Sequence, residues 1–187
     1  MTRETIPPRI ETASLIIRRW SEADADLLRS AIDSSLDHLR AWMPWAMNEP
    51  VSLDDTRARL AGYAAAFDAG EEFVVGLFDR EESFVVGGAG LHRRIAEGGL
   101  ELGYWIRSAH VRRGFATEAA RALTNAGLAL AGVDRIQIRC DPNNVASRRI
   151  PERLGYGLIE IRHSDTFTPS GSPRDTAVFE TTTGLRD

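Results

Sequence analysis

The spacing of apolar and polar residues predicts an N-terminal region made of one strand and several helices. Mixed apolar and basic residues at 14–20 indicate the strand, and Ser21 with Asp24 three residues later predicts a capped helix directly after it. We expect helix to continue through residues 37–43 until Pro44 interrupts it. Ser52, followed by acidic residues, predicts the start of a further capped helix.

The middle of the chain carries three apolar stretches at short spacing, residues 72–78, 83–92 and 99–106. Charged or glycine-containing turns separate them, which predicts an antiparallel meander. From Phe115 the apolar residues fall at helical spacing, and Gly132 is expected to end that helix.

Residues 134–140 indicate another strand, and the order strand, helix, strand predicts a right-handed parallel crossover. A turn and a short helix capped by Asn143 or Asn144 and ended at Gly155 come next. Pro151 cannot donate a hydrogen bond to the carbonyl of Ser147, so we expect this helix to bend or to be short.

Two further strands near 157–163 and 174–182 complete a single α+β domain over residues 1–187. Its sheet is expected to be mixed, with helices flanking it.

Composition agrees with one globular domain and excludes several classes of protein. The 187 residues are 43% hydrophobic, and no apolar run approaches the ~18 residues of a membrane span. Residues 1–10 lack the pattern of a secretory signal, so we expect a cytoplasmic protein. A net charge of −4 gives no general attraction to nucleic acid or to anionic membranes.

Residue usage also limits the chemistry. Cys140 is the single cysteine, which excludes an internal disulfide, and the four histidines lie far apart without metal-site spacing. No metal is therefore implied. All 23 basic residues are arginine, which excludes a Schiff-base lysine and the lysine of a Walker phosphate loop.

Arginines gather at one turn, before the helix that starts at Phe115: Arg107, Arg112, Arg113 and Arg121. The first amide groups of that helix have no partner within it, and the helix dipole adds to their positive potential. Gly114 and Ala116 would let an anion approach the backbone closely. The turn therefore predicts a phosphate site, although a solvated basic turn is equally compatible with these residues alone.

Residues 99–156 carry several motifs in a fixed order, "ELGYWIRSAHVRRGFATEAARALTNAGLAL" followed by "DRIQIRCDPNNVASRRIPERLGY". This order resembles the GCN5-related N-acetyltransferase (GNAT) superfamily, and most of all its ribosomal-protein N-terminal acetyltransferase branch. The likeness extends more weakly to "SLIIRRW" and "WMPWA". It implies the GNAT fold, a mostly antiparallel twisted sheet in which one parallel strand pair splays, and acetyl-CoA as the co-substrate.

By this resemblance, the turn V-R-R-G-F-A at 111–116 would hold the pyrophosphate of acetyl-CoA through backbone N–H groups. Val111 departs from the Gln or Arg of the family motif, which affects a backbone site little. The resemblance implies a set of cofactor-binding residues, in which Asn144 would bond the pantetheine amides: Trp105, Ile106, Arg107, Val111, Arg112, Arg113, Gly114, Phe115, Ala116, Thr117 and Asn144.

The resemblance also implies roles in catalysis. Ser147 would protonate the departing thiolate, and a backbone N–H near Trp105 would meet the oxyanion. Without the resemblance, Asn144 is simply a helix cap and Ser147 a helix serine bonded to its own backbone. Alternation along the strand places Glu101, Gly103 and Trp105 on one face.

Glu101 is therefore expected beside the gap, as the base or as a plain exposed carboxylate. His110 and Asp141 are reserve candidates for the base. Trp42 and Trp45, with Met43, would line the acceptor side, unless they are core residues.

These expectations combine into an N-acetyltransferase that moves an acetyl group directly to a primary amine, foremost a protein N-terminal α-amine of the ribosomal-protein type. The acceptor is alternatively a small-molecule amine or an antibiotic. A non-catalytic acyl-CoA sensor is a third reading, although a pure binder would not need Glu101 and Ser147. Relatives often pair, so a homodimer is possible.

Overall fold

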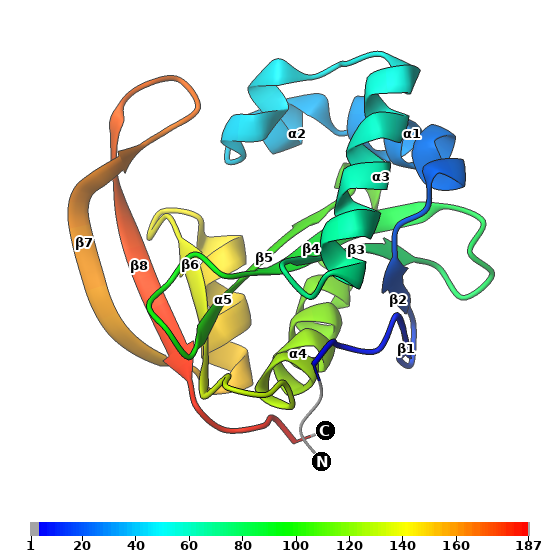
Figure 1. Ribbon diagram of the computed structural model, residues 1–187. Coiled ribbons are helices and arrows are strands. Elements are labelled where there is room, and N and C mark those ends of the chain that lie inside the picture. The colour runs from blue at the N-terminus through cyan, green and yellow to red at the C-terminus, as the bar shows by residue number, and fades with distance from the viewer. Residues whose placement is uncertain (1–3, 187) are drawn as a thin grey trace.

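The computed structural model describes residues 4–186, so the first three residues of the N-terminal segment considered above lie outside it. Within that range the chain builds one eight-stranded sheet in the order β1-β2-β3-β4-β5-β6-β8-β7 (Figure 1). Every neighbouring pair is antiparallel except β5 and β6. This confirms the α+β prediction of a mixed, mostly antiparallel sheet. The strands are β1 (Arg9–Glu11), β2 (Ile16–Arg19), β3 (Phe73–Phe78), β4 (Val85–His92), β5 (Gly99–Ile106), β6 (Arg135–Cys140), β7 (Gly157–Phe167) and β8 (Pro173–Thr181).

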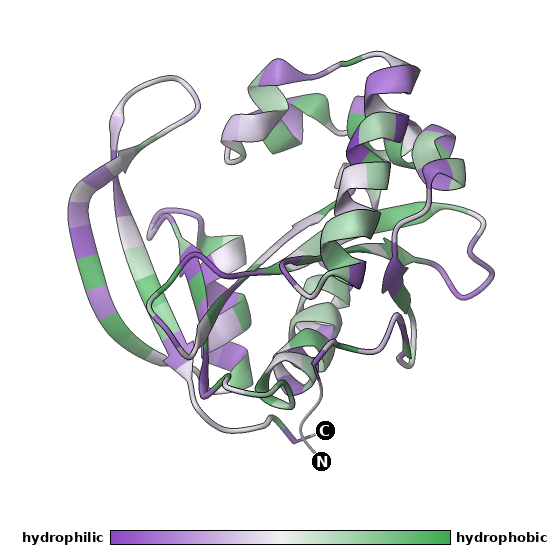
Figure 2. Cartoon of the chain, in the orientation of Figure 1, coloured by the Kyte–Doolittle hydropathy of each residue, from purple (hydrophilic) through white to green (hydrophobic). Residues whose placement is uncertain are grey.

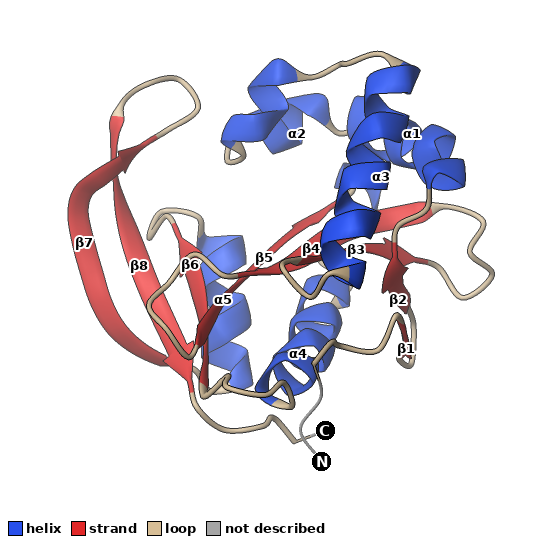
Figure 3. Cartoon of the chain, in the orientation of Figure 1, coloured by secondary structure: helices blue, strands red, loops and turns tan. Residues whose placement is uncertain are grey.

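Helices lie on both faces of the sheet (Figure 3). They are α1 (Ala25–Asp33), α2 (Leu36–Arg40), α3 (Leu53–Asp68), α4 (Phe115–Leu128) and α5 (Val145–Leu154), with short 3₁₀ helices at Glu22–Asp24, Pro44–Asn48 and Ser108–His110. In the part of the chain that the structure describes, none of the helices has the length and apolar character needed to cross a membrane.

The predicted helix caps are confirmed. Ser21 and Asp24 form a capping box, although the first turn after it is 3₁₀ rather than α. The Ser52 hydroxyl accepts a hydrogen bond from the Asp55 amide at 3.0 Å at the start of α3. Gly155 ends α5 in the left-handed conformation, with φ of 79°.

Two helix ends were predicted wrongly. The helix expected through residues 37–43 ends at Arg40, and Pro44 begins a 3₁₀ helix, because a proline fits the first turn of a helix better than its interior. Helix α4 ends at Leu128, before Gly132. The Leu130 amide there bonds the Gly127 carbonyl at 3.1 Å, in a turn that buries the Leu130 side chain.

Apolar side chains form a core on each face of the sheet, and Figure 2 shows the apolar central strands between the helices. On one face, Leu123 of α4 and Leu154 of α5 pack in a cluster with Leu100 and Ile138 of the sheet. On the other face, α1, α2 and α3 cover Ile16 and neighbouring strand residues. The sheet is therefore the middle layer, and each face meets a different group of helices.

Strands β5 and β6 pair over only a short length. The register joins Gly99–Glu101 of β5 to Arg135–Gln137 of β6, whereas β5 stays paired with β4 as far as Ile106. Strand β6 likewise stays paired with β8 as far as Cys140. The two parallel strands therefore diverge beyond Glu101, which confirms the predicted splayed pair.

Candidate active site

Two cavities meet where β5 and β6 diverge. The first, here called the sheet cavity, has a volume of about 650 Å³ and is lined by residues that include Trp45, His92 and Glu101. The second, here called the helix cavity, has about 660 Å³ and lies at the first turns of α4 and α5. Six residues line both cavities: Trp42, Met43, Tyr104, Trp105, Asn144 and Ser147. A ligand that crosses from one to the other must pass these six side chains.

The first turn of α4 is open to the helix cavity. Gly114 is the N-cap with φ of 86°, and no side chain caps this end of the helix. A Cβ built on Gly114 would meet nothing within 4 Å. Arg112 also has positive φ, 62°, which is uncommon outside glycine, and the first backbone amide groups of α4 have no partner within the helix. These amide groups suit an anion such as phosphate.

The structure brings only part of the predicted arginine cluster to this cavity. Arg112 lines it, together with the predicted residues Ile106, Val111, Phe115, Ala116 and Thr117. The Arg107 guanidinium instead donates to the Ser30 hydroxyl of α1 at 3.5 Å and to the hydroxyl of Ser34, the residue that caps the end of α1, at 3.0 Å. Arg113 is exposed and is not among the lining residues.

Two other arginines enter the helix cavity from α5. Arg149 and Arg153 line it beside Ile150. Sequence analysis missed them, although their separation by four residues places both on one helical face and could have indicated this. The arginines of this cavity therefore come from α5 as well as from the turn before α4.

The start of α5 holds Asn144 and Ser147 between the two cavities. Asn144 Oδ1 accepts a hydrogen bond from the Ser147 amide at 3.1 Å, so Asn144 is the helix cap. This bond uses only the oxygen of the Asn144 amide and leaves its NH₂ group available to a ligand. The cap and the predicted pantetheine contact are therefore compatible.

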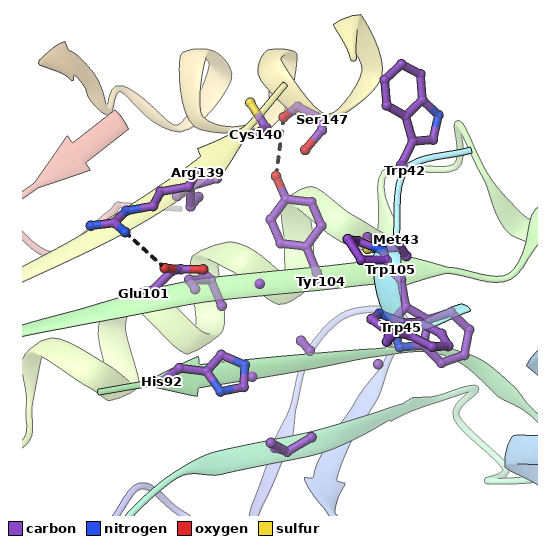
Figure 4. A pocket seen from close by; sticks show the side chains of 18 of the residues that line it. Trp42, Met43, Trp45, His92, Glu101, Tyr104, Trp105, Arg139, Cys140 and Ser147 are labelled. Atoms are coloured by element: carbon purple, nitrogen blue, oxygen red, sulfur yellow. Dashed lines mark hydrogen bonds and ion pairs between the residues drawn. The ribbon is translucent and has the colours of Figure 1, made fainter. Parts of the chain in front are cut away.

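Three glycines line the sheet cavity on the side of the β-sheet. Gly88, Gly90 and Gly103 line it, and a Cβ at Gly88 would lie 2.6 Å from Nε1 of Trp105. A Cβ at Gly90 would similarly lie 2.6 Å from Nε2 of His92. The missing side chains let both rings lie against the strands, as Figure 4 shows for the view into the pocket.

The tryptophans form an apolar wall at one end of this cavity. The rings of Trp45 and Trp105 meet edge to face, with centroids 6.0 Å apart. Trp42, Trp45 and Met43 are half-buried and line the cavity, and Met43 and Trp45 also pack against the core beneath α1 and α3. Their predicted contact with an acceptor stays a prediction.

Titratable groups gather at the opposite end. Glu101 lies 3.5 Å from the Arg139 guanidinium of β6, and both side chains are about one-fifth exposed, at 20% and 23%. His92 pairs with Glu101 in the register of β4 and β5. Its Nδ1 lies 3.3 Å from a carboxylate oxygen of Glu72, without hydrogen-bond geometry.

Burial lowers the pKa of the His92 imidazole below its ordinary value. Arg94 lowers this pKa further, while the carboxylates of Glu72 and Glu101 oppose the shift. The lowered pKa favours the neutral form of the ring, which has a nitrogen lone pair that can accept a proton. Sequence analysis missed His92, because strand alternation shows its face only once the register with Glu101 is known.

The reserve residues lie in different places. His110 lines the helix cavity and stacks on Phe84, with ring centroids 4.9 Å apart. Asp141 is buried and lines the sheet cavity, and its Oδ1 accepts the Asn143 amide at 2.8 Å. Cys140 lines the sheet cavity as well, and burial raises the pKa of its thiol to about 11.

This arrangement suits the transfer of a group from a phosphate-bearing donor in one cavity to an acceptor in the other. Ser147, at the junction, has a hydroxyl that can donate a proton. Glu101 and His92 supply proton acceptors on the sheet side. Among residues 4–186, no group of three or more His, Cys, Asp or Glu side chains is placed to hold a metal ion.

Comparison with known proteins agrees with this geometry. A family model described as an acetyltransferase (GNAT) domain matches residues 14–157. The N-acetyltransferase YjdG of Bacillus subtilis is 38% identical over 61 residues, which are 33% of this chain and 36% of YjdG. The match therefore spans about a third of the length of that relative.

Solved structures share the fold over nearly the whole chain. The microcin C7 self-immunity acetyltransferase MccE, in complex with acetyl-CoA and AMP, matches with a TM-score of 0.85 at 15% identity, covering 96% of this chain and 99% of its own. RimL, a ribosomal L7/L12 α-N-protein acetyltransferase in complex with coenzyme A, gives a TM-score of 0.82 at 17% identity, with 97% and 99% covered.

The surroundings of His92 lead to a prediction about its titration. Replacing Glu72 by Gln removes a carboxylate that raises the pKa of His92, so the ring should titrate at lower pH than in the unchanged protein. Arg94→Gln removes an opposing charge and should shift the titration to higher pH. Both shifts can be read from the imidazole resonances in an NMR titration.

The same shift links His92 to folding. Because the folded-state pKa lies below the unfolded value of ~6.5, this group should cost stability as pH falls through that value. If Glu72→Gln and Arg94→Gln moved the pKa of His92 in the same direction, this account of the charges around His92 would be wrong.

Proposed function

The chain belongs to the acetyltransferase (GNAT) family and is an acetyl-CoA-dependent N-acetyltransferase, and from this premise we propose that its acceptor is the N-terminal α-amine of a protein. The observation that carries the proposal is the junction of two cavities at the splayed strands, with Ser147 at the junction and Glu101 across from it. The donor would occupy the helix cavity, and the acceptor would enter through the sheet cavity.

The helix cavity fits the donor. Uncapped amide groups at Gly114 and the guanidinium of Arg112 would hold the pyrophosphate, and Arg149 and Arg153 add positive charge from α5. The free NH₂ of Asn144 would bond the pantetheine arm. Bound acetyl-CoA supplies a reactive thioester, so no covalent enzyme intermediate is needed.

Glu101 is proposed as the proton acceptor for the amine. Arg139 lies 3.5 Å from its carboxylate, which would accept the proton directly or through water. Ser147 is proposed to give its hydroxyl proton to the thiolate as the C–S bond breaks and to take back the second proton of the amine nitrogen, so that the serine ends unchanged. A backbone N–H of β5 near Trp105, where β6 has diverged, would stabilise the negative charge on the oxygen of the acetyl group during transfer.

The lining of the sheet cavity supports a peptide as the acceptor. Carboxylates of Glu72, Glu101 and Asp141 and guanidiniums of Arg94 and Arg174 line one space beside the tryptophan wall. A peptide N-terminus presents an ammonium group, amides and side chains together, so it matches this mixture better than a purely apolar amine does. RimL, of the same fold, acts on a protein α-amine.

A second candidate acceptor is a small amine that carries a planar ring. The indole rings of Trp45 and Trp105 would favour such a compound, and the MccE structure, of the same fold, contains AMP. A non-catalytic acyl-CoA sensor is less consistent with the site, because binding alone does not require Glu101 and Ser147 beside the junction.

A thiol-release assay with acetyl-CoA and a panel of amines tests the acceptor. Peptides with a free N-terminus should release coenzyme A faster than small aromatic or aliphatic amines. The matched control is each peptide with its N-terminus blocked, which should release none. Faster turnover of small amines would favour the second candidate, and tight acetyl-CoA binding without thiol release for any amine would favour a sensor.

Replacing Gly114 by valine tests the phosphate site. Valine is strained at φ of 86° and would project into the open space at the start of α4, so coenzyme A affinity should fall roughly tenfold or more. Gly132→Val is the matched control, because Gly132 has φ of 74° and equally open surroundings but does not line the helix cavity. Calorimetric titration measures both variants, and equal affinities would argue against the site.

Replacing Glu101 by Gln tests the base. Turnover should fall about 100-fold near pH 6.5 and less near pH 9, because an α-amine with a pKa of ~8 is then largely neutral without help. Glu97→Gln, an exposed residue in the turn before β5, is the control and should keep the unchanged profile of rate against pH. If the turnover of Glu101→Gln fell by the same factor at every pH, Glu101 would not be the base.

A further inference from the structure

We propose that Tyr104 is a positioning residue that holds Ser147 in place by filling a hydrogen bond that Pro151 removes from α5. The Tyr104 hydroxyl donates to the Ser147 carbonyl oxygen at 3.2 Å (Figure 4). The catalytic part of this inference depends on the proposed role of Ser147, whereas the structural part does not.

The Ser147 carbonyl is unpaired within α5 for a covalent reason. In an α-helix this oxygen would accept from the amide of the residue four positions later, which here is Pro151. Proline has no N–H, yet the helix continues past it to Leu154. The carbonyl therefore needs a donor from outside the helix, and Tyr104 supplies one.

Tyr104 is placed to do this by the splay of the sheet. It stands on β5 three residues beyond Glu101, where the pairing with β6 has ended. Its ring crosses the gap toward α5 and lines both cavities. Burial raises the pKa of the Tyr104 phenol, so the hydroxyl keeps its proton and stays a donor across the range of ordinary assays.

The Ser147 main chain is thus held at both of its polar groups. Asn144 Oδ1 accepts from its amide at 3.1 Å, and Tyr104 donates to its carbonyl at 3.2 Å. Two side chains from different elements therefore fix one residue at the junction of the cavities. Loss of the Tyr104 bond should let the turn that carries Ser147 shift, while Tyr104 itself transfers no proton.

The test combines two substitutions. Tyr104→Phe removes the hydroxyl and should lower kcat roughly 3- to 10-fold, with a smaller change in KM for acetyl-CoA. Pro151→Ala restores an amide that can bond the Ser147 carbonyl, so it should recover most of this loss in the double variant and leave kcat nearly unchanged alone. Tyr156→Phe is the matched control, because its buried hydroxyl bonds Thr124 and does not line either cavity.

Hydrogen exchange of the peptide that spans residues 144–154 gives a readout that does not need activity. Exchange should speed up in Tyr104→Phe and return toward the original rate when Pro151→Ala is added. The proposal is overturned if adding Pro151→Ala to Tyr104→Phe changes neither the lowered turnover nor the faster hydrogen exchange. Should no amine be acetylated by the unchanged protein, the exchange result alone decides whether Tyr104 holds α5.

Discussion

The site depends on hydrogen bonds that the sheet leaves unmade. Pairing between β5 and β6 stops at Glu101, while each strand keeps its other neighbour. Backbone groups that face a gap must find water, a ligand or a side chain, because leaving them unpaired is costly. The divergence therefore produces a gap between β5 and β6 that is lined by polar backbone groups, here called the slot. Both α4 and α5 begin beside it.

One short stretch of β5 beside this slot makes two different contacts, one from each face of the strand. Tyr104 and Trp105 are neighbours, so their side chains point to opposite faces of the strand. Tyr104 reaches α5, while Trp105 lies over Gly88 on β4 and meets Trp45. A shift of this strand by one residue would exchange the two faces, so the register with β4 fixes the hydrogen bond to α5 and the tryptophan wall together.

Local sequence was enough to predict the features that depend on neighbouring residues. The caps at Ser52 and Asn144, the meander, the parallel pair and the glycine at the start of α4 all follow from short-range chemistry. Side-chain direction does not follow in this way. Arg107 belongs to the predicted cluster, yet it bonds serines more than 70 positions earlier in the chain, with separations of 73 and 77. His92 was missed for the same reason, because its partners come from two other segments.

The ion pair between Glu101 and Arg139 shows how the site and the fold constrain each other. Glu101 is the last residue of β5 that pairs with β6, and Arg139 lies on β6 just beyond the pairing, so the ion pair bridges the start of the slot that Tyr104 spans farther along. Both side chains are partly exposed, so solvent screens the attraction and its contribution to stability is small. Its main effect is local: the guanidinium of Arg139 helps to fix the position of the Glu101 carboxylate beside the slot.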